Sequence, residues 1–318
     1  MLLTPRPSSR AGHDGHPRRR RLTVAVLAAV AMAAAPLAAA ASPALAASAA
    51  SHPSHPSLSY LKAHAGQVHM GWELSPRKAT SPPPLRSIPL LSGVLGERAA
   101  GPQIASAASS EVLGLDVSSV QGDVNWSTVK ADGAQFAYVK ATEGNYYTNP
   151  DFTQQYDGSY DVGLIRGAYE FANPSVSSGT NQADYFVAHG GGWSADGKTL
   201  PGVLDIEYNP YGAECYGLSQ SSMVSWIRAF VNEYHAKTGR WAVIYSTTDW
   251  WTTCTGNNSG FGSEDPLWLA DFASSPGALP AGWGFYTIWQ YADSGTFPGD
   301  QDVFNGTSAR LSALALNT

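Results

Sequence analysis

Short apolar runs recur along residues 111–318 with the lengths of buried strands, and polar, turn-like or helix-like stretches separate them. We expect strands near residues 112–117, 136–140, 164–169, 202–207, 241–245, 266–270, 285–291 and 303–304. Apolar residues with helical spacing predict helices near residues 126–130, 154–162, 183–189 and 223–238. Because strands alternate with helices, the pattern predicts an α/β fold with a parallel sheet.

This rhythm changes after Tyr245, where the last strands are joined by stretches too short for full helices. About five βα units followed by three barer strands would close an irregular, TIM-like (β/α) barrel. In such barrels the reactive groups lie at the C-terminal ends of the strands. An open doubly wound sheet is the alternative fold, since it shares the alternation but gives no reason for the bare strands.

The first 110 residues follow another pattern. Residues 18–21 are four arginines, an apolar run covers residues 22–41, and a small-x-small sequence follows at residues 44–46. This order predicts a signal peptide over residues 1–46 and a secreted protein with no membrane segment after cleavage, although the export route stays open. A membrane anchor is the alternative. Residues 47–110, rich in Ala, Ser, Pro and His, are expected to be a disordered linker or pro-segment.

Composition sets residues 111–318 apart as a packed, acidic domain. They carry nine of the ten Trp and fourteen of the fifteen Tyr. They also hold 22 acids against 8 Lys plus Arg, a formal charge of 8 − 22 = −14. So acidic a domain argues against nucleic acid as a partner. We expect one catalytic domain over residues 111–318 that acts as a monomer.

The cysteines and histidines limit the possible chemistry. Cys215 and Cys254 are the only cysteines, and in an exported protein they favour a single disulfide, with two free buried thiols as the alternative. Six of the eight histidines precede residue 111, which leaves His189 and His235 in the domain. Two histidines are too few for a His metal cluster and leave little choice for a Ser-His-Asp triad. We therefore expect no metal and no cofactor.

Acidic residues gather at the predicted strand ends, which would place a ring of carboxylates around one barrel mouth. The ring consists of Asp116, Glu143, Glu170, Asp205, Glu207, Asp271 and either Asp300 or Asp302. Its strongest element is Leu204-Asp205-Ile206-Glu207, because residues two apart on a strand face the same side. Asp205 and Glu207 then point into the mouth while Leu204 and Ile206 face the helices. Crowding raises one pKa of such a pair, which suits glycoside hydrolysis.

Aromatic side chains are candidates for stacking on sugar faces, although core packing is the alternative for any single Trp. Trp250 and Trp251 are the preferred sugar contacts, since they are adjacent and lie beyond a predicted strand end. The residues expected to bind substrate are Glu143, Tyr169, Glu170, Tyr245, Trp250, Asp271 and Trp289.

From about Gly114 to Gly306 the chain resembles glycoside hydrolase family 25, the secreted lysozymes of bacterial and phage type. The resemblance rests on Gly114-Leu115-Asp116-Val117-Ser118 with Gln121-Gly122, Phe136-Ala137-Tyr138-Val139-Lys140-Ala141-Thr142-Glu143-Gly144, Asp205-Ile206-Glu207, and Trp289-Gln290-Tyr291 ahead of Gly299-Asp300. It implies an irregular β/α barrel and hydrolysis of the β-1,4 bond from N-acetylmuramic acid to N-acetylglucosamine in peptidoglycan.

The same resemblance implies roles for single residues. Glu207 would be the proton donor, Asp205 its charged partner, and Asp116 and Asp300 supporting acids, with Asp302 as an alternative to Asp300. The family usually has His where this chain has Glu170, and an extra carboxylate there is expected to raise the pKa of the acid.

Two other functions remain open at this stage. One is a secreted barrel that binds cell-wall glycan without cutting it, although every expected acid is present. The other is a chitinase or endo-N-acetylglucosaminidase, which would carry further acids ahead of Asp205, for example where this chain has Val203.

Overall fold

The computed structural model describes Met70 and residues 111–318. The signal peptide expected over residues 1–46 and the linker expected over residues 47–110 lie outside the described residues, apart from Met70. The elements in chain order are β1 (Val112–Val117), α2 (Trp126–Ala131), β2 (Phe136–Glu143), β3 (Tyr147–Thr148), α3 (Phe152–Asp161), β4 (Ile165–Phe171), α4 (Gly179–Phe186), the π-helix η1 (Val187–Gly191), β5 (Val203–Asp205), α5 (Gln220–Thr238), β6 (Val243–Ser246), α6 (Thr248–Thr255), β7 (Leu267–Ala270), β8 (Ile288–Ala292), β9 (Asp300–Phe304) and α7 (Ser308–Leu316).

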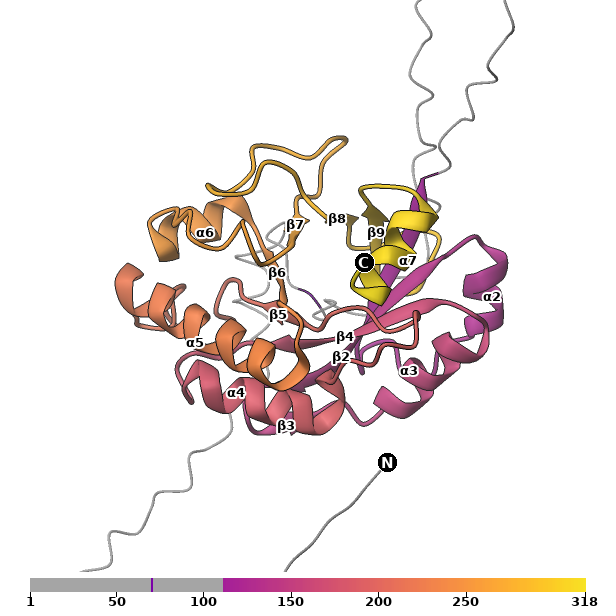
Figure 1. Cartoon of the computed structure of the whole chain (residues 1–318), viewed down its shortest axis with the longest axis horizontal. Helices are drawn as coiled ribbons and strands as arrows, with labels where there is room; N and C mark the ends of the chain where they lie inside the picture. The colour runs from indigo at the N-terminus through magenta and orange to yellow at the C-terminus, as the bar shows by residue number, and fades with distance from the viewer. Residues whose placement is uncertain (1–69, 71–110) are drawn as a thin grey trace, which may run out of the picture. The chain divides into compact units, whose positions relative to one another are not determined.

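Eight of these strands form a closed barrel. Hydrogen bonding follows the order β1-β9-β8-β7-β6-β5-β4-β2 and returns to β1 through a β1–β2 pairing, while the two-residue β3 is added beside β2. The helices lie around the outside of the strands (Figure 1). Five strands are each followed by a helix before the barer β7, β8 and β9, which confirms the predicted barrel. Closure excludes the open doubly wound sheet.

The direction of the last strand differs from the parallel sheet that the alternation predicts. β9 pairs antiparallel with both β1 and β8. The reason is the connection between β8 and β9, which covers only residues 293–299. A parallel crossover needs a dozen or more residues, whereas a short link suffices for an antiparallel pair. Consequently β9 begins at the mouth where the parallel strands end.

Alternate residues of the strands pack into an inner apolar cluster, an outer cluster under α4, α5 and α6, and a further cluster beside α2 and α3. Leu204 and Ile206 pack in the outer cluster with Phe230 of α5, as the sequence predicted. The inner cluster fills the barrel and consists of Met70, Val112, Phe136, Tyr138, Tyr169, Leu200, Val203, Val243, Tyr245, Trp268, Ala270, Ile288, Phe304, Leu311 and Ala315. The Trp268 ring lies 4.8 Å from that of Tyr138 and 5.4 Å from that of Tyr245, between centroids. Large aromatic side chains therefore form a packed floor beneath the mouth.

Local signals explain the longest helix, α5. The Ser219 side chain caps its first turn by accepting a hydrogen bond from the Ser222 amide, and Gly239 ends it in the left-handed conformation at φ 72°. Trp226, Phe230 and Tyr234 are buried on its inner face. The predicted helical spacing near residues 223–238 was therefore correct, with an earlier start.

Helix α6 is not among the four helices predicted from helical spacing, although it completes the five βα units that were expected. It starts after Thr247, whose side chain accepts a hydrogen bond from the Trp250 amide. Cys254 lies near its end and forms the predicted disulfide with Cys215, with the two Cα atoms 5.3 Å apart. The bridge ties α6 to the connection between β5 and α5.

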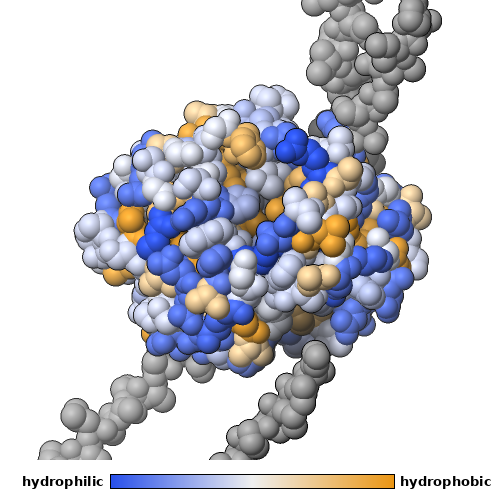
Figure 2. Space-filling view, in the orientation of Figure 1, coloured by the Kyte–Doolittle hydropathy of each residue, from blue (hydrophilic) through white to orange (hydrophobic). Residues whose placement is uncertain are grey.

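The surface of the described chain carries few large apolar side chains. Those that are clearly exposed lie on five separate segments and are Val120, Tyr160, Val176, Phe285 and Leu316. On the face drawn in Figure 2, hydrophilic residues predominate and apolar ones are scattered among them. No helix in this part of the chain is long and apolar enough to cross a membrane.

Asp265 is a buried carboxylate at the end of the barrel opposite the mouth, just before β7. It is 1% exposed, and neither of its carboxylate oxygens has a hydrogen-bond partner among the described residues. Burial raises the pKa of Asp265 to about 8, against a smaller opposing effect of Arg228. The folded protein therefore holds a proton on Asp265 at pH values where the unfolded chain releases it.

Replacing Asp265 by Asn tests this pKa. A raised folded-state pKa contributes stability that is complete below the unfolded value near 4 and is lost as pH rises to about 8. Relative to the parent, Asp265→Asn should gain up to about 1.4 kcal/mol in the free energy of unfolding per pH unit across this window. Urea unfolding at pH 4 to 9 measures the difference, and a difference that does not change with pH would contradict the raised pKa.

Candidate active site

Six carboxylates from five chain segments meet at the barrel mouth. Asp116 lies near the end of β1, Glu143 ends β2, Glu170 lies near the end of β4, Asp205 ends β5, Glu207 follows two residues later and Asp300 begins β9. All six are at most 5% exposed. The parallel strands bring their C-terminal ends to one rim, and the reversed β9 adds its N-terminal end there.

Asp205 and Glu207 form the centre of this group, although only Asp205 belongs to a strand. β5 ends at Asp205, and the Ile206 amide continues the pairing by donating to the Tyr245 carbonyl oxygen at 3.1 Å. Neither carboxylate oxygen of Asp205 has a hydrogen-bond partner among the described residues. Burial and the charge of Glu207 raise the pKa of Asp205. Burial also raises the pKa of Glu207, opposed by Lys140 and by a hydrogen bond from Met70.

Such a pair has a defined chemical use. Two buried carboxylates that interact this strongly share charge and proton unequally, so one stays protonated where an isolated acid would be ionised. The protonated member can donate to a leaving oxygen, and the ionised member can stabilise a developing positive charge.

Gln290 holds two further acids in place, a role that sequence reasoning missed. Its side-chain amide donates to Asp116 Oδ2 at 2.8 Å and to Asp300 Oδ2 at 3.1 Å. The Tyr245 hydroxyl donates to Gln290 Oε1 at 2.8 Å and so fixes which end of the amide faces the acids. Gln290 was visible as part of Trp289-Gln290-Tyr291, but nothing in the sequence indicated which carboxylates it contacts.

Asp300 lies closer to the mouth than Asp302. Asp300 pairs with Asp116 at the end of β1, whereas Asp302 pairs with Gly114, two residues deeper. The Trp268 indole donates to Asp302 Oδ1 at 3.1 Å. Burial and the neighbouring Asp116 raise the pKa of Asp302. The deeper acid is therefore part of the barrel floor.

Glu143 is held by one cation and two hydroxyls. Lys140 Nζ lies 2.8 Å from its Oε2, Tyr146 donates to its Oε1 at 2.7 Å, and Tyr211 donates to the same oxygen. Burial alone would raise the pKa of Glu143, but Lys140 and the two hydroxyls lower it. Glu143 is therefore ionised beside Lys140. The contact with Tyr211, from the β5–α5 connection, could not be read from the sequence.

Glu170 is fully buried beside these groups. Thr142 Oγ1 donates to its Oε2 at 3.4 Å, and burial, with Glu143 and Asp205 nearby, raises its pKa. The described groups that shift the pKa of Glu207 most are Met70, Lys140 and Asp116, not Glu170. The expected influence of Glu170 on the pKa of the acid thus finds no direct support.

The expected sugar contacts Trp250 and Trp251 are wrong. Both belong to α6, are 0% exposed and pack in the outer cluster with residues such as Leu204, away from the mouth. The adjacency that suggested a surface site is the start of a helix whose inner face they form. Adjacent tryptophans after a strand are therefore no guide to a stacking surface here.

The other expected contacts lie in three places. Tyr169 and Tyr245 are on the barrel floor, directly next to the acids. Trp289 lies on the opposite face of β8 from Gln290, and its indole N–H donates a hydrogen bond to the Asp271 carbonyl oxygen at 2.8 Å. The Asp271 carboxylate accepts from the Gly277 amide at 3.0 Å and so shapes a loop at the rim. Their contact with a substrate stays a prediction.

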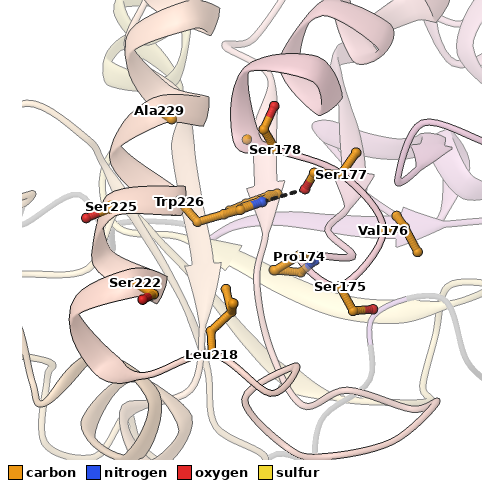
Figure 3. Close-up of a pocket in the computed structure, with 11 residues that line it drawn as sticks. Pro174, Ser175, Val176, Ser177, Ser178, Leu218, Ser222, Ser225, Trp226 and Ala229 are labelled. Carbon is orange, nitrogen blue, oxygen red and sulfur yellow. Dashed lines mark hydrogen bonds between the residues drawn. The ribbon is translucent and has the colours of Figure 1, made fainter.

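A separate groove of about 470 Å³ lies between the β4–α4 connection and α5 (Figure 3). Its lining contains serines, Leu218 and Trp226, whose indole donates to the Ser177 carbonyl oxygen at 2.8 Å. No ionisable residue lines it, so it does not supply acid or base chemistry. Within the described residues no cluster of His, Cys, Asp and Glu could hold a metal ion.

Comparison with known proteins gives consistent matches. The sequence model of Glycosyl hydrolases family 25 matches residues 115–300. Lysozyme M1 of Streptomyces globisporus is 51% identical over 227 residues, which are 70% of this chain and 76% of the relative. N,O-diacetylmuramidase of Chalaropsis sp is 48% identical over 208 residues, 64% of this chain and 99% of the relative. The solved structure of a muramidase from Acremonium alcalophilum is 55% identical with a TM-score of 0.64, covering 65% of this chain and all of that one.

The buried Lys140–Glu143 pair yields a test of the charge balance. Lys140→Met leaves Glu143 as an uncompensated buried charge, so the free energy of unfolding at pH 7 should fall by about 3 kcal/mol. The loss should shrink as pH falls and Glu143 takes up a proton. The lowered pKa of Glu143 stabilises the parent above the pKa of the unfolded chain, and this stability is lost as pH falls through the pKa of the folded protein. Urea unfolding of the variant and the parent measures it.

Two further variants serve as controls. Lys140→Met combined with Glu143→Met should recover most of the lost stability, because no lone charge remains. Lys237→Met breaks an ion pair with Asp184 whose side chains are 40% and 45% exposed. That change should cost much less stability than Lys140→Met, because solvent screens an exposed ion pair. Equal losses at both lysines would mean that burial of the Lys140 pair carries no special penalty.

Proposed function

The chain belongs to glycosyl hydrolases family 25 and is a peptidoglycan-hydrolysing muramidase, and we propose that Glu207 and Asp205 carry out its chemistry. The observation that supports these roles is the pair itself: two buried carboxylates, each with a raised pKa, two residues apart at the end of β5.

Glu207 is the proton donor in this proposal. It gives its proton to the glycosidic oxygen as the bond to C1 of N-acetylmuramic acid breaks, so that N-acetylglucosamine leaves with a new hydroxyl. Asp205 stabilises the positive charge that develops at C1, and water then adds there to complete the hydrolysis. Burial without a described hydrogen-bond donor leaves the Asp205 oxygens available to the sugar, either directly or through its acetamido group.

Asp116 and Asp300 act as supporting acids at the wall of the mouth, oriented by Gln290. Asp300 is preferred to Asp302 for this role because it lies at the rim, while Asp302 is bonded to Trp268 in the floor. Lys140 supplies a positive charge near these acids, and it lowers the pKa values of Asp205 and Glu207 against the effect of burial.

The domain boundaries, export and assembly are part of the same proposal. Residues 1–46 act as a signal peptide, residues 47–110 as a leader, and residues 111–318 as the catalytic domain. The disulfide between Cys215 and Cys254 is consistent with an extracellular enzyme. The scattered exposed apolar residues are consistent with a monomer.

Digestion of purified peptidoglycan tests the catalytic assignment. The full chain, residues 111–318 alone, and Glu207→Gln variants of both are compared, and mass spectrometry identifies the sugar at each new reducing end. Muramic acid ends from the parent proteins only are expected, with a rate loss of about 100-fold or more in the variants.

Other outcomes of the digestion assign other functions. Glucosamine ends would identify an endo-N-acetylglucosaminidase. Binding to walls without cleavage by any form would favour the non-catalytic barrel. Muramic acid ends produced equally by the Glu207→Gln variants would remove Glu207 as the proton donor.

Gln290→Met tests the positioning of Asp116 and Asp300. The variant keeps the length of the side chain but leaves both carboxylates without their shared donor. We expect kcat to fall about tenfold or more, with a smaller change in KM, because an unmade hydrogen bond to a charged group costs about 1.5–3 kcal/mol.

Gln301→Met is the matched control. Gln301 is equally buried, but its amide donates to the backbone oxygens of Phe297 and Gly299 and contacts no acid. It should lower the melting temperature while kcat of the folded enzyme stays within about twofold, since no hydrogen bond to the acids changes. A parallel loss of kcat in both variants would indicate a general effect on the barrel.

A further inference from the structure

Met70, the one described residue ahead of the domain, reaches the proposed proton donor. Its backbone N–H donates to Glu207 Oε1 at 2.8 Å, across 137 positions of sequence. The residue is 0% exposed. A residue outside the barrel sequence therefore occupies the barrel mouth at its reactive carboxylate.

The side chain of Met70 strengthens this placement. It belongs to the inner apolar cluster, together with Tyr169, Tyr245 and Trp268 of the barrel floor. An unbranched thioether fills irregular space well and gains contacts with aromatic rings. Met70 is thus held both by a backbone hydrogen bond to a carboxylate and by burial of its side chain.

This contact opposes the chemistry proposed for Glu207 in two ways. The N–H group takes the place next to Oε1 that a substrate oxygen needs in order to receive a proton. It also favours the ionised carboxylate, and among the described groups it is the largest influence that lowers the pKa of Glu207 against burial. The contact therefore offsets part of the rise in the pKa of Glu207 that burial causes, and so weakens the hold of Glu207 on the proton that it must donate.

Chain length allows this arrangement, and the barrel does not need it. Residues 71–110 are 40 residues, whose extended reach of about 130 Å far exceeds the distance along one barrel strand. In the match with the Chalaropsis relative, 64% of this chain covers 99% of the relative. A part of this chain about the size of the barrel domain therefore accounts for nearly the whole of the matched relative.

We propose that Met70 is a built-in inhibitor: it occupies the place of the substrate at Glu207 and keeps the chain latent until the leader is cut or displaced. The proposal rests on the proposed role of Glu207. It assigns to residues 47–110 the function of a pro-segment and makes proteolysis within residues 71–110 the activating event.

Substitution of Met70 in the full chain tests the contact. Met70→Pro removes the N–H donor, Met70→Gly removes the side chain, and Met70→Leu keeps both the donor and an apolar side chain of similar size. Loss of the hydrogen bond should raise the initial rate of wall digestion about tenfold or more. Met70→Gly should raise it less, and Met70→Leu should stay within about twofold of the parent, because apolar swaps of equal volume are well tolerated.

Cleavage of the leader provides the second measurement. A site-specific protease sequence is placed within residues 71–110 of the parent and of Met70→Pro. Cutting should raise the rate of the parent to that of Met70→Pro and leave Met70→Pro unchanged. An equal rise in both chains would mean that other leader residues inhibit, and would overturn the assignment to Met70.

Glu207→Gln is also introduced into the parent chain and into Met70→Pro. These variants distinguish failure of the inhibitor proposal from failure of the catalytic role on which it rests. If Glu207→Gln abolishes digestion while Met70→Pro and the parent digest walls at the same rate, the inhibitor proposal fails and the catalytic role stands. If neither the full chains nor residues 111–318 digest walls, both proposals fail.

Discussion

The arrangement of this barrel depends on keeping six carboxylates buried at one mouth. Each loses hydration and repels the others, so the group is tolerated only where cations, hydrogen-bond donors or protons offset the charge. The chain uses all three: Lys140 beside Glu143, the Gln290 amide between Asp116 and Asp300, and protons on acids whose pKa values are raised. At Asp205 and Glu207 the compensation is incomplete, so both pKa values stay raised, and the proposed chemistry depends on that.

Much of the architecture could be predicted from periodicity. Buried strands and amphipathic helices each have a characteristic spacing of apolar residues, which the sequence shows directly. The two-residue spacing of Asp205 and Glu207 likewise predicted that both side chains point into the mouth. Strand direction is a different matter. β9 is reversed because its connection is short, and that follows only once the strand boundaries at residues 292 and 300 are known.

The partners of the acids could not be predicted. Gln290 and Tyr211 reach their carboxylates across long sequence separations, and nothing in their local sequence indicates the contact. Trp250 and Trp251 misled for a related reason: an aromatic pair has the same composition in a core and on a sugar-binding surface, and only the packing of α6 distinguishes the two. Nothing in the spacing around Met70 indicated which surface it contacts.

The position of Met70 makes the enzyme's latency a matter of effective concentration. While residues 71–110 connect it to the barrel, the mouth meets its own inhibitor at about millimolar concentration, whatever the dilution of the protein. One cut anywhere in that tether makes the same contact bimolecular. Outside a cell, where the protein is dilute, the freed segment then leaves by dilution alone, and activation becomes irreversible without any change in the affinity of the site.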